Sequence, residues 1–177
     1  MTMNTKNEQI PIKWYAAKTT FSMTKKIKKQ LEKLKVDHFI PLRTMIEERK
    51  GKKVKIEKPV VPNLIFIHTG YPTCLSLVND YGLAMKFLTD LEKHTFLVVP
   101  DKQMEDFMFL LDFSEEAVLV LNENLRQGDR VRVIKGDFAG IEGELIRIKG
   151  HKRVVVRLEG LFSLATTYIP STFLERI

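Results

Sequence analysis

The sequence predicts an α+β protein, in which a segment of alternating strands and helices is followed by a small β domain. Three observations support this fold class. Apolar residues between positions 13 and 111 change several times between the two-residue period of strands and the period of about 3.6 that helices show. From position 125 onward β-branched residues and turn glycines dominate, and the apolar residues keep the strand period. The segment 114–124, acidic at its start and polar at its end, is typical of a domain junction.

The first elements are a strand, a helix and an interrupted strand. Residues 13–18, KWYAAK, have strand character, and Thr20 or Ser22 is a candidate cap for the helix that follows. This helix carries one apolar stripe among its lysines, made of Met23, Ile27, Leu31 and Leu34. Residues 37–48 return to strand character, and Pro41 makes them an edge strand or a bulged strand.

A basic hairpin is predicted next, over residues 49–58, RKGKKVKIEK, with Gly51 in its turn. Like charges on a short turn repel each other, and a polyanion would relieve this repulsion while releasing its counterions. The candidate nucleic-acid contacts are Arg49, Lys50, Lys52, Lys53 and Lys55. The alternative is a solvated loop that binds no partner.

Strands and two further helices complete the first domain. Residues 60–69 are the most apolar strand candidate, buried on both faces or presented to a partner on one of them. A helix over 73–81 and strands over 83–88 and 95–99 follow. The last helix starts with Asp101 as its cap and has an apolar stripe made of Met104, Phe107, Met108 and Leu111. The predicted element order to this point is βαββαβα.

The last fifty or so residues predict a small five-stranded β barrel. Two β-like runs between positions 125 and 148 flank a turn that contains Gly136, Gly140 and Gly143, with Phe138 at its tip. Residues 153–158 and 165–169 are further strands, and residues 117–121 are apolar enough for a short one. Because β-branched valines and turn glycines disfavour a helix, we expect this domain to be constitutively β.

Charge is distributed unevenly along the chain, whose net charge is +7. Residues 1–58 hold 16 Lys and Arg against 6 Asp and Glu, residues 59–124 hold 3 against 10, and residues 125–177 hold 10 against 6. A basic block beside an acidic block indicates a partner-facing arrangement of charge, and nucleic acid is the usual partner of the basic part.

Several function classes are not supported. The single cysteine, Cys74, excludes an internal disulfide framework and a zinc cluster built on cysteines, and it is interpreted as a core residue. The four histidines are far apart, and no HExxH, GxSxG or Walker-type loop occurs, so neither an enzyme nor a metal or cofactor site is expected. No signal-peptide core and no long apolar run occur, so we expect a cytoplasmic protein without a membrane span.

The run GDRVRVIKGDFAGIEG resembles the KOW motif of the NusG/Spt5 and ribosomal-protein families. Together with WYAA, VPNLIFI, MKFL and VVPD, in this order, it makes the chain similar to NusG-family transcription elongation factors. The runs RKGKKVK, NLIFIH and RVVVRLEG are most similar to the UpxY-type specialised paralogues of Bacteroides-like bacteria. The resemblance implies an N-terminal NusG-type α/β sandwich with an antiparallel sheet over 1–113, a linker over 114–124, and an SH3-like barrel with the KOW motif over 125–177.

The resemblance also implies a function. The first domain would dock on the clamp helices of RNA polymerase through an apolar patch, and the chain would suppress pausing and termination on specific long operons, such as those for polysaccharide biosynthesis. The implied patch consists of Trp14, Tyr15, Val61, Leu64, Phe66 and Phe87. The basic hairpin would lie near upstream DNA or nascent RNA. Phe138 and Ile141 correspond to the positions where relatives bind a ribosomal protein or a termination factor.

Three alternatives stay open. The patch residues could be ordinary core. The chain could be a general NusG-type factor that promotes termination, or a ribosome-associated RNA-binding protein, since ribosomal proteins also contain KOW barrels.

Overall fold

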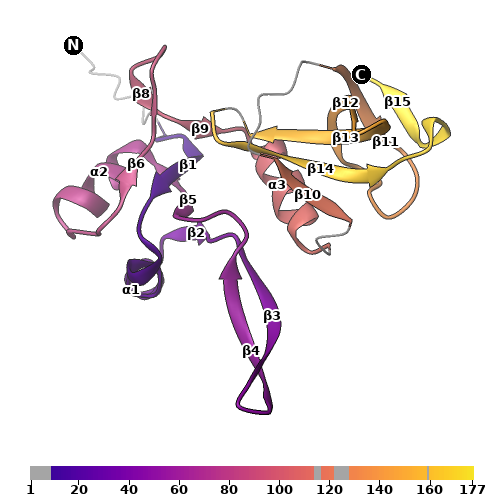
Figure 1. The fold of residues 1–177 in the computed structure, drawn as a ribbon. Helices are drawn as coiled ribbons and strands as arrows, with labels where there is room; N and C mark the ends of the chain where they lie inside the picture. The colour runs from indigo at the N-terminus through magenta and orange to yellow at the C-terminus, as the bar shows by residue number, and fades with distance from the viewer. Residues whose placement is uncertain (1–8, 114–116, 122–127, 159) are drawn as a thin grey trace, which may run out of the picture. The chain divides into compact units, whose positions relative to one another are not determined.

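The computed structural model describes residues 9–113, 117–121, 128–158 and 160–177 and has a mixed α/β fold with antiparallel sheets (Figure 1). Three α-helices occur in the described residues, and none of them combines the length and apolar character that crossing a bilayer requires. The chain forms two compact units. Residues 1–39 and 63–98 make up the first unit, and residues 40–62 and 99–177 the second.

An antiparallel sheet is the centre of the first unit. Its strands lie in the order β2 (Asp37–Phe39), β5 (Leu64–Gly70), β1 (Ile12–Lys18) and β6 (Lys86–Phe87), and the short strand β9 (Val98–Val99) also pairs with β1. In β5, Leu64 to Ile67 are all buried, which agrees with the first of the two predicted alternatives, a strand buried on both faces. The predicted strand 83–88 is reduced to β6, and the next one is divided between β8 (Thr95–Phe96) and β9. A small hairpin of β7 (Thr89–Asp90) and β8 accounts for part of this difference.

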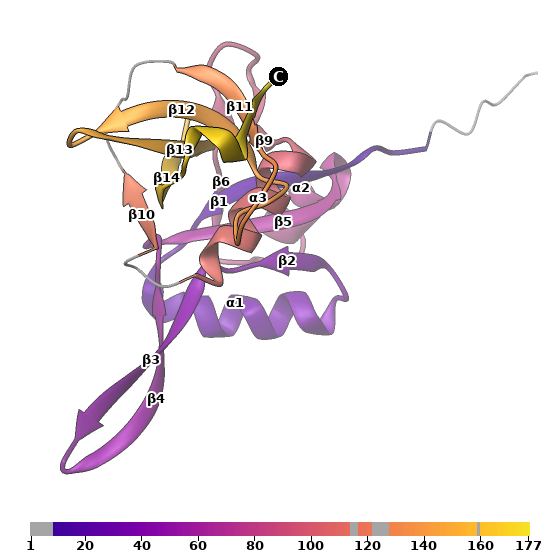
Figure 2. The same ribbon diagram turned by 90° about the vertical axis from the view of Figure 1, so that its right-hand side faces the viewer.

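Two helices belong to the same unit. α1 (Phe21–Lys33) buries Ile27 and Leu31, as its stripe predicts, and it lies beside β2 in both views (Figures 1 and 2). Thr20 occupies the N-cap position, but its hydroxyl oxygen lies 3.1 Å from that of Ser22, and no side chain caps the helix. α2 (Tyr71–Asn79) starts two residues before the predicted position and buries Cys74.

Pro41 divides the predicted strand 37–48 into two elements. The first part is β2, which is an edge strand as predicted. The second part is β3 (Leu42–Arg49), which pairs with β4 (Lys52–Pro59) to form a two-stranded ribbon in the second unit. The physical cause is that proline has no N–H to donate to a neighbouring strand.

α3 (Asp101–Leu111) also belongs to the second unit. The expectation that Asp101 caps this helix is wrong, because Pro100 holds the N-cap position and Asp101 is the first helical residue. There its carboxylate still interacts favourably with the positive end of the helix dipole. Leu110, which the predicted stripe leaves out, is fully buried beside the predicted Met104 and Phe107.

A six-stranded antiparallel sheet forms the rest of the second unit. Its order is β10 (Val118–Leu121), β14 (Phe162–Tyr168), β13 (His151–Leu158), β12 (Glu142–Ile148), β11 (Asp129–Val133) and β15 (Leu174–Arg176), with a short 3-10 helix at Ser171–Phe173. Five of these strands lie in the last fifty residues, as predicted. The sixth, β10, lies within the segment predicted as a linker and pairs with β14. Residues 114–116 and 122–124 of the predicted junction lie outside the described residues, so the domain boundaries and the closure of this sheet into a barrel stay predictions.

The turn glycines between β11 and β12 have the roles that their spacing indicates. Gly136 and Gly140 adopt φ values of +83° and +95°, where an L side chain is strained. Gly143 instead allows close strand approach, since a Cβ there would lie 2.5 Å from the carbonyl oxygen of Val155. These glycines thus set the path of the loop 134–141, which contains Phe138.

Candidate functional site

The basic hairpin is held by a two-residue turn. Arg49 pairs in register with Lys52, so only Lys50 and Gly51 connect the strands. Both have positive φ, at +52° and +74°, the combination that a type I′ turn requires. This turn matches the natural twist of antiparallel strands, and therefore a short sequence builds a regular ribbon eight residues long on each side.

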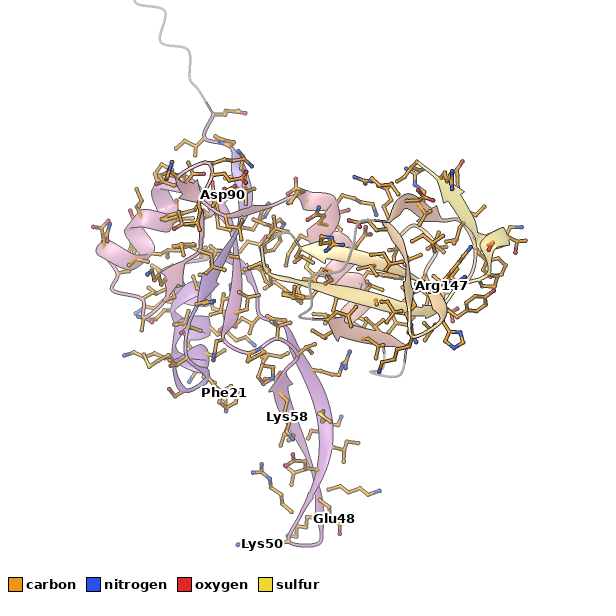
Figure 3. The ribbon with its side chains drawn as sticks, turned by 45° about the horizontal axis from the view of Figure 1, so that its top comes forward. Phe21, Glu48, Lys50, Lys58, Asp90 and Arg147 are labelled. Carbon is orange, nitrogen blue, oxygen red and sulfur yellow. The ribbon has the colours of Figure 1, made fainter. Side chains whose placement is uncertain are left out.

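Cationic side chains cover the distal half of this ribbon. Glu47 accepts hydrogen bonds from Arg49 at 3.2 Å and from Lys58, and these neighbours, Lys58 first, lower the pKa of its carboxyl. The four lysines of the predicted site, Lys50, Lys52, Lys53 and Lys55, are exposed and form no ion pair within the described parts of the chain. Figure 3 shows Lys50 at the tip and Lys58 nearer the base.

The ribbon presents charge on both of its faces. Side chains of paired residues share a face and successive pairs alternate, so Arg49 and Lys52 lie on one face while Lys53 and Lys55 lie on the other. Each of these faces also carries one acid, Glu47 on the first and Glu48, the register partner of Lys53, on the second. The structure thus brings the five predicted residues together at one tip, and a polyanion could contact them from either side.

Apolar residues on the ribbon contribute little to a core. Ile46 is 65% exposed and Val54 is 39% exposed. Two-stranded ribbons of this kind are marginally stable alone, because neither face buries apolar area. The stability of the fold therefore does not explain the length of the ribbon.

The predicted polymerase-binding patch does not form one surface in the first unit. Trp14 shares a sheet face with Leu64 and Phe66, because Ala16 pairs with Phe66 and Lys18 pairs with Leu64. We call these three the Trp14 face. The Trp14 ring stacks on the His68 imidazole at 4.5 Å, and His68 Nδ1 lies 3.1 Å from an Asp37 carboxylate oxygen. Leu64 and Phe66 are 6% and 0% exposed.

Tyr15 and Phe87 lie on the opposite sheet face, which we call the Tyr15 face, since Ala17 pairs with Phe87. Their rings contact each other edge to face, with centroids 6.4 Å apart, and Phe96 stacks on Phe87 at 4.8 Å. Burial is the main factor that raises the pKa of the Tyr15 hydroxyl. This arrangement favours the core interpretation for Tyr15 and Phe87. Val61 belongs to the other compact unit.

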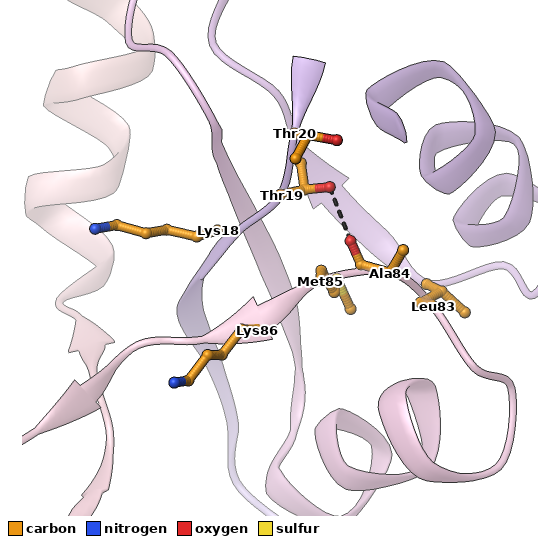
Figure 4. Close-up of a pocket in the computed structure, with 7 residues that line it drawn as sticks. All are labelled: Lys18, Thr19, Thr20, Leu83, Ala84, Met85 and Lys86. Carbon is orange, nitrogen blue, oxygen red and sulfur yellow. Dashed lines mark hydrogen bonds between the residues drawn. The ribbon is translucent and has the colours of Figure 1, made fainter. Parts of the chain in front are cut away.

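The sequence prediction missed a pair of lysines beside the Trp14 face. Lys18 and Lys86 are exposed cross-strand partners and line a shallow hollow of about 470 Å³. Figure 4 shows their side chains extending to one side of the strands, while the α1 and α2 helices lie on the other. No sequence spacing identifies such a pair, because only the register of β1 with β6 places residues 68 positions apart opposite each other.

The predicted partner site on the KOW-like loop is partly covered. The Phe138 ring lies 4.6 Å from that of Phe113, and Ile141 is 1% exposed. Two polar contacts hold the same loop to α3, where the Lys102 ammonium donates to the Gly140 carbonyl at 2.9 Å and Asp106 accepts from the Glu142 N–H at 3.2 Å. Phe138 is thus half-buried and Ile141 is a core residue of the second unit.

Chemistry at the remaining candidates is limited. Burial raises the pKa of the Cys74 thiol to about 12, which disfavours the thiolate that a nucleophile needs. In the described residues no group of three or more His, Cys, Asp or Glu could hold a metal ion. The arrangement is therefore one of binding surfaces: a basic ribbon, an apolar sheet face and an aromatic loop.

The profile of a family described as "Transcription termination factor nusG" matches residues 12–108, more than half of the chain. A comparison with curated proteins gave no match. A solved structure described as "Domain interaction in Thermotoga maritima NusG" is 19% identical with a TM-score of 0.48, covering 94% of this chain and 98% of that one. A second, the "MjSpt4:Spt5 complex conformation B", is 14% identical with a TM-score of 0.27, covering 93% and 96%. On the profile match alone, the chain belongs to the NusG family of transcription factors.

Proposed function

We propose that this chain is a transcription elongation factor that binds RNA polymerase and suppresses pausing and termination on specific long operons, such as those for polysaccharide biosynthesis. The observation that carries the proposal is the basic β3–β4 ribbon on a chain of the NusG family, whose members bind RNA polymerase. The similarity of its sequence runs to UpxY-type paralogues supports the specialised role. NusG-family proteins are non-enzymatic, and we propose that this chain acts in the cytoplasm without catalysis or cofactor.

The Trp14 face is the proposed docking surface for the clamp helices of the polymerase. Within the first unit, α1 and α2 lie on the opposite side of β1 and β6 from Lys18 and Lys86, so the described residues of that unit place no helix on the Trp14 side (Figure 4). The proposed surface joins Trp14 and Leu64, which are 8% and 6% exposed, to the two exposed lysines, which supply charge at its margin.

The remaining contacts extend the proposal to nucleic acid and to a protein partner. The lysines of the β3–β4 ribbon would contact phosphates of upstream DNA or nascent RNA, which position the factor without reading sequence. Phe138 is the proposed contact for a ribosomal protein or a termination factor. Ile141 would support the loop from within the core, since it is 1% exposed.

A general elongation and termination factor is the second candidate function. It is favoured by the matched family profile, which is described as a termination factor. The two candidates predict opposite signs in one assay, because the first raises and the second lowers the yield of transcript beyond a terminator.

Docking is tested best with exposed residues. Replacing Leu64 and Phe66 by Asp would place carboxylates in buried positions and unfold the domain, so loss of binding would be uninformative. The substitutions Lys18→Glu and Lys86→Glu change exposed side chains beside the Trp14 face. The matched control is Lys13→Glu with Lys25→Glu, which makes the same change of charge at exposed positions elsewhere.

The experiment is transcription by purified polymerase of a long template with an internal terminator, together with retention of polymerase on the immobilised chain. We expect the chain to retain polymerase and to increase read-through, and we expect the Lys18 and Lys86 variant to lose both effects while the control keeps them. Increased termination would assign the general function instead. Retention of ribosomal RNA without polymerase would overturn both.

A further inference from the structure

The outer edge of strand β3 is a row of unused backbone hydrogen-bonding groups. Arg49 and Lys52 flank the two-residue turn and form a hydrogen-bonded pair, and from there hydrogen-bonded and non-hydrogen-bonded pairs alternate along the ribbon. Thr44, Ile46 and Glu48 therefore direct their N–H and C=O groups away from β4. Within the described parts of the chain, these groups have no backbone partner, and no strand of the second unit lies along this edge (Figures 1 and 2). Such an edge can accept another strand.

The two outer edges of the ribbon differ in charge. β4 contains four lysines against one acid and ends at Pro59. Lysine and proline are residues with which proteins keep an edge strand from pairing with another chain. β3 contains two arginines and two glutamates and so carries no net charge. The edge of β3 is therefore the one that the sequence leaves open to pairing.

The order of charges along β3 favours a second copy of the same strand. A two-fold axis perpendicular to the sheet makes the two strands antiparallel, and outward-facing residues must then lie opposite each other, for example Thr44 opposite Ile46 of the second copy. In this register Arg43 lies opposite Glu47 of the second copy, and the symmetry forms this attractive pair twice. A shift by two residues loses both pairs, because Arg43 then lies opposite either Arg49 or an uncharged residue.

The same register joins apolar residues of the two ribbons into one row. Met45 lies opposite Met45 of the second copy at the two-fold axis, and Ile56 is the register partner of Met45 within each ribbon. Four apolar side chains thus lie side by side on one face, where Met45 of a single chain is 37% exposed. A two-stranded ribbon is marginally stable, whereas more strands with an apolar face support each other, so pairing stabilises the ribbon.

The present contacts of Arg43 and Glu47 are compatible with this pairing. The Arg43 guanidinium donates to the Phe113 carbonyl at 2.8 Å, and a guanidinium can donate several hydrogen bonds at once. Glu47 accepts from Arg49 at 3.2 Å and from Lys58, and a carboxylate can likewise accept several. The pairs across the two-fold axis therefore add to these contacts and do not replace them.

We propose that the β3 edge is a self-association surface, through which two copies of this chain pair as antiparallel strands around a two-fold axis at Met45. The two ribbons form one four-stranded sheet in the order β4, β3, β3, β4. The lysines of β4 lie on its outer strands and stay accessible to nucleic acid. The pairing requires neither polymerase nor nucleic acid, so its test can fail while the proposed function stands, and the reverse.

The mass of the full chain in solution tests the association. Sedimentation equilibrium over a range of protein concentrations should give an average mass that rises from 20.5 kDa toward twice this value. A mass that stays at 20.5 kDa at every concentration would overturn the proposal.

Charge reversal tests the register. Arg43→Glu sets carboxylates opposite each other, and Glu47→Arg sets guanidinium groups opposite each other. Each variant alone should dimerise about 5- to 100-fold more weakly than the parent, because two attractive pairs become repulsive. An equal mixture of the two variants should recover the association, since every opposed pair again has opposite charges. Lys25→Glu, the same change of charge at an exposed position on α1, is the control and should dimerise like the parent.

Cysteine cross-linking tests the position of the axis. Met45 directs its backbone groups toward β4, so Met45→Cys places two thiols in a non-hydrogen-bonded pair with Cα atoms ~4.5 Å apart, which a disulfide can span. Val54→Cys is the matched control, because Val54 is 39% exposed and lies on the same face. Its two copies are about 14 Å apart, three strand spacings, which is too far for a disulfide. The natural Cys74 is buried and does not interfere.

Mild oxidation should link Met45→Cys into a covalent dimer and leave Val54→Cys as separate chains. Equal yields from both variants would overturn the proposal, and so would a mixture of the charge variants that fails to associate. A Lys25→Glu control that dimerises as weakly as Arg43→Glu would show that net charge, and not the register, controls association. Thermal unfolding of each variant verifies that the fold is kept.

Discussion

At the scale of single residues, Asp106 shows how one carboxylate links a helix to a turn. Its side chain is 7% exposed and accepts hydrogen bonds from the Lys102 ammonium at 2.6 Å and from the Glu142 N–H. Burial raises the pKa of this carboxyl above its usual 3.8, although Lys102 and the Glu142 N–H act in the opposite direction. In this contact between α3 and the KOW-like loop, desolvation therefore affects the Asp106 pKa more than the hydrogen-bond partners do.

The first prediction follows from the sign of this shift. A raised pKa in the folded state contributes stability below pH 3.8 that is lost as the pH rises through the folded-state pKa. Asp106→Asn removes the titration and keeps one acceptor oxygen. The unfolding free energy of the variant should therefore rise relative to that of the parent as the pH rises from about 3 toward neutrality. Urea unfolding of the full chain at several pH values measures this difference.

Asp90→Asn is the matched control with the opposite sign. Backbone N–H groups of Lys93 and Glu92 bind the Asp90 carboxylate and lower its pKa. The stability that Asp90 contributes is present above its unfolded-state pKa and is lost as the pH falls. The unfolding free energy of Asp90→Asn should therefore fall relative to that of the parent as the pH rises. A direct ¹³C titration that placed the Asp106 carboxyl pKa below 3.8 would contradict the first prediction.

At the scale of elements, the β3–β4 ribbon and the β12–β13 strand pair differ in what supports them. In the described parts of the chain the β3–β4 ribbon has no third strand, whereas β12 and β13 are inner strands of a six-stranded sheet. A change of surface charge on the ribbon therefore affects contact with a partner more than packing, because its lysines are exposed and cover no core.

The second prediction concerns this ribbon. Replacing Lys50, Lys52, Lys53 and Lys55 by Ala should reduce the salt dependence of binding to a DNA duplex, with a slope lower by up to about 3.6 if all four contact phosphates. Titration of a labelled duplex at several salt concentrations measures the slope. Lys25→Ala, Lys26→Ala, Lys28→Ala and Lys29→Ala on α1 serve as the control of equal charge, and an equal reduction by that control would show that the ribbon has no special role.

At the scale of the whole molecule, the C-terminal part is a β structure with many long-range partners. β13 pairs with both β12 and β14, and Val154, Val155 and Val156 are almost completely buried in it. Three consecutive β-branched residues in one strand disfavour the helical alternative that the sequence already argues against.

The third prediction is that residues 129–176 of the free full-length chain are β in solution. Amide and Cα chemical shifts should indicate strands over β11 to β15, while residues 101–111 of the same sample give helical shifts and so serve as an internal control. Helical shifts over residues 129–158 would show that the domain adopts another fold when free.

Local signals were sufficient for much of this fold. The four-residue steps of Ile27 and Leu31 predict α1, because the apolar face of a helix repeats with its turn. The lysine–glycine turn at Lys50 and the glycines of the KOW-like loop predict their hairpins, since both depend on backbone conformations that a few residues specify. The short strand β7 was not predicted, and the strand predicted over 83–88 is reduced to the two residues of β6, because two residues carry no period.

The sequence by itself determined the order of the main elements, the basic ribbon and the resemblance that points to the NusG family, because each of these depends on residues close together in the chain. Only the tertiary structure decided which side chains share a surface. The register of β1 with β5 and β6 separates Trp14 and Leu64 from Tyr15 and Phe87, and it places Lys18 opposite Lys86. Pairing between strands distant in sequence follows from the packing of the whole sheet, which no local pattern encodes.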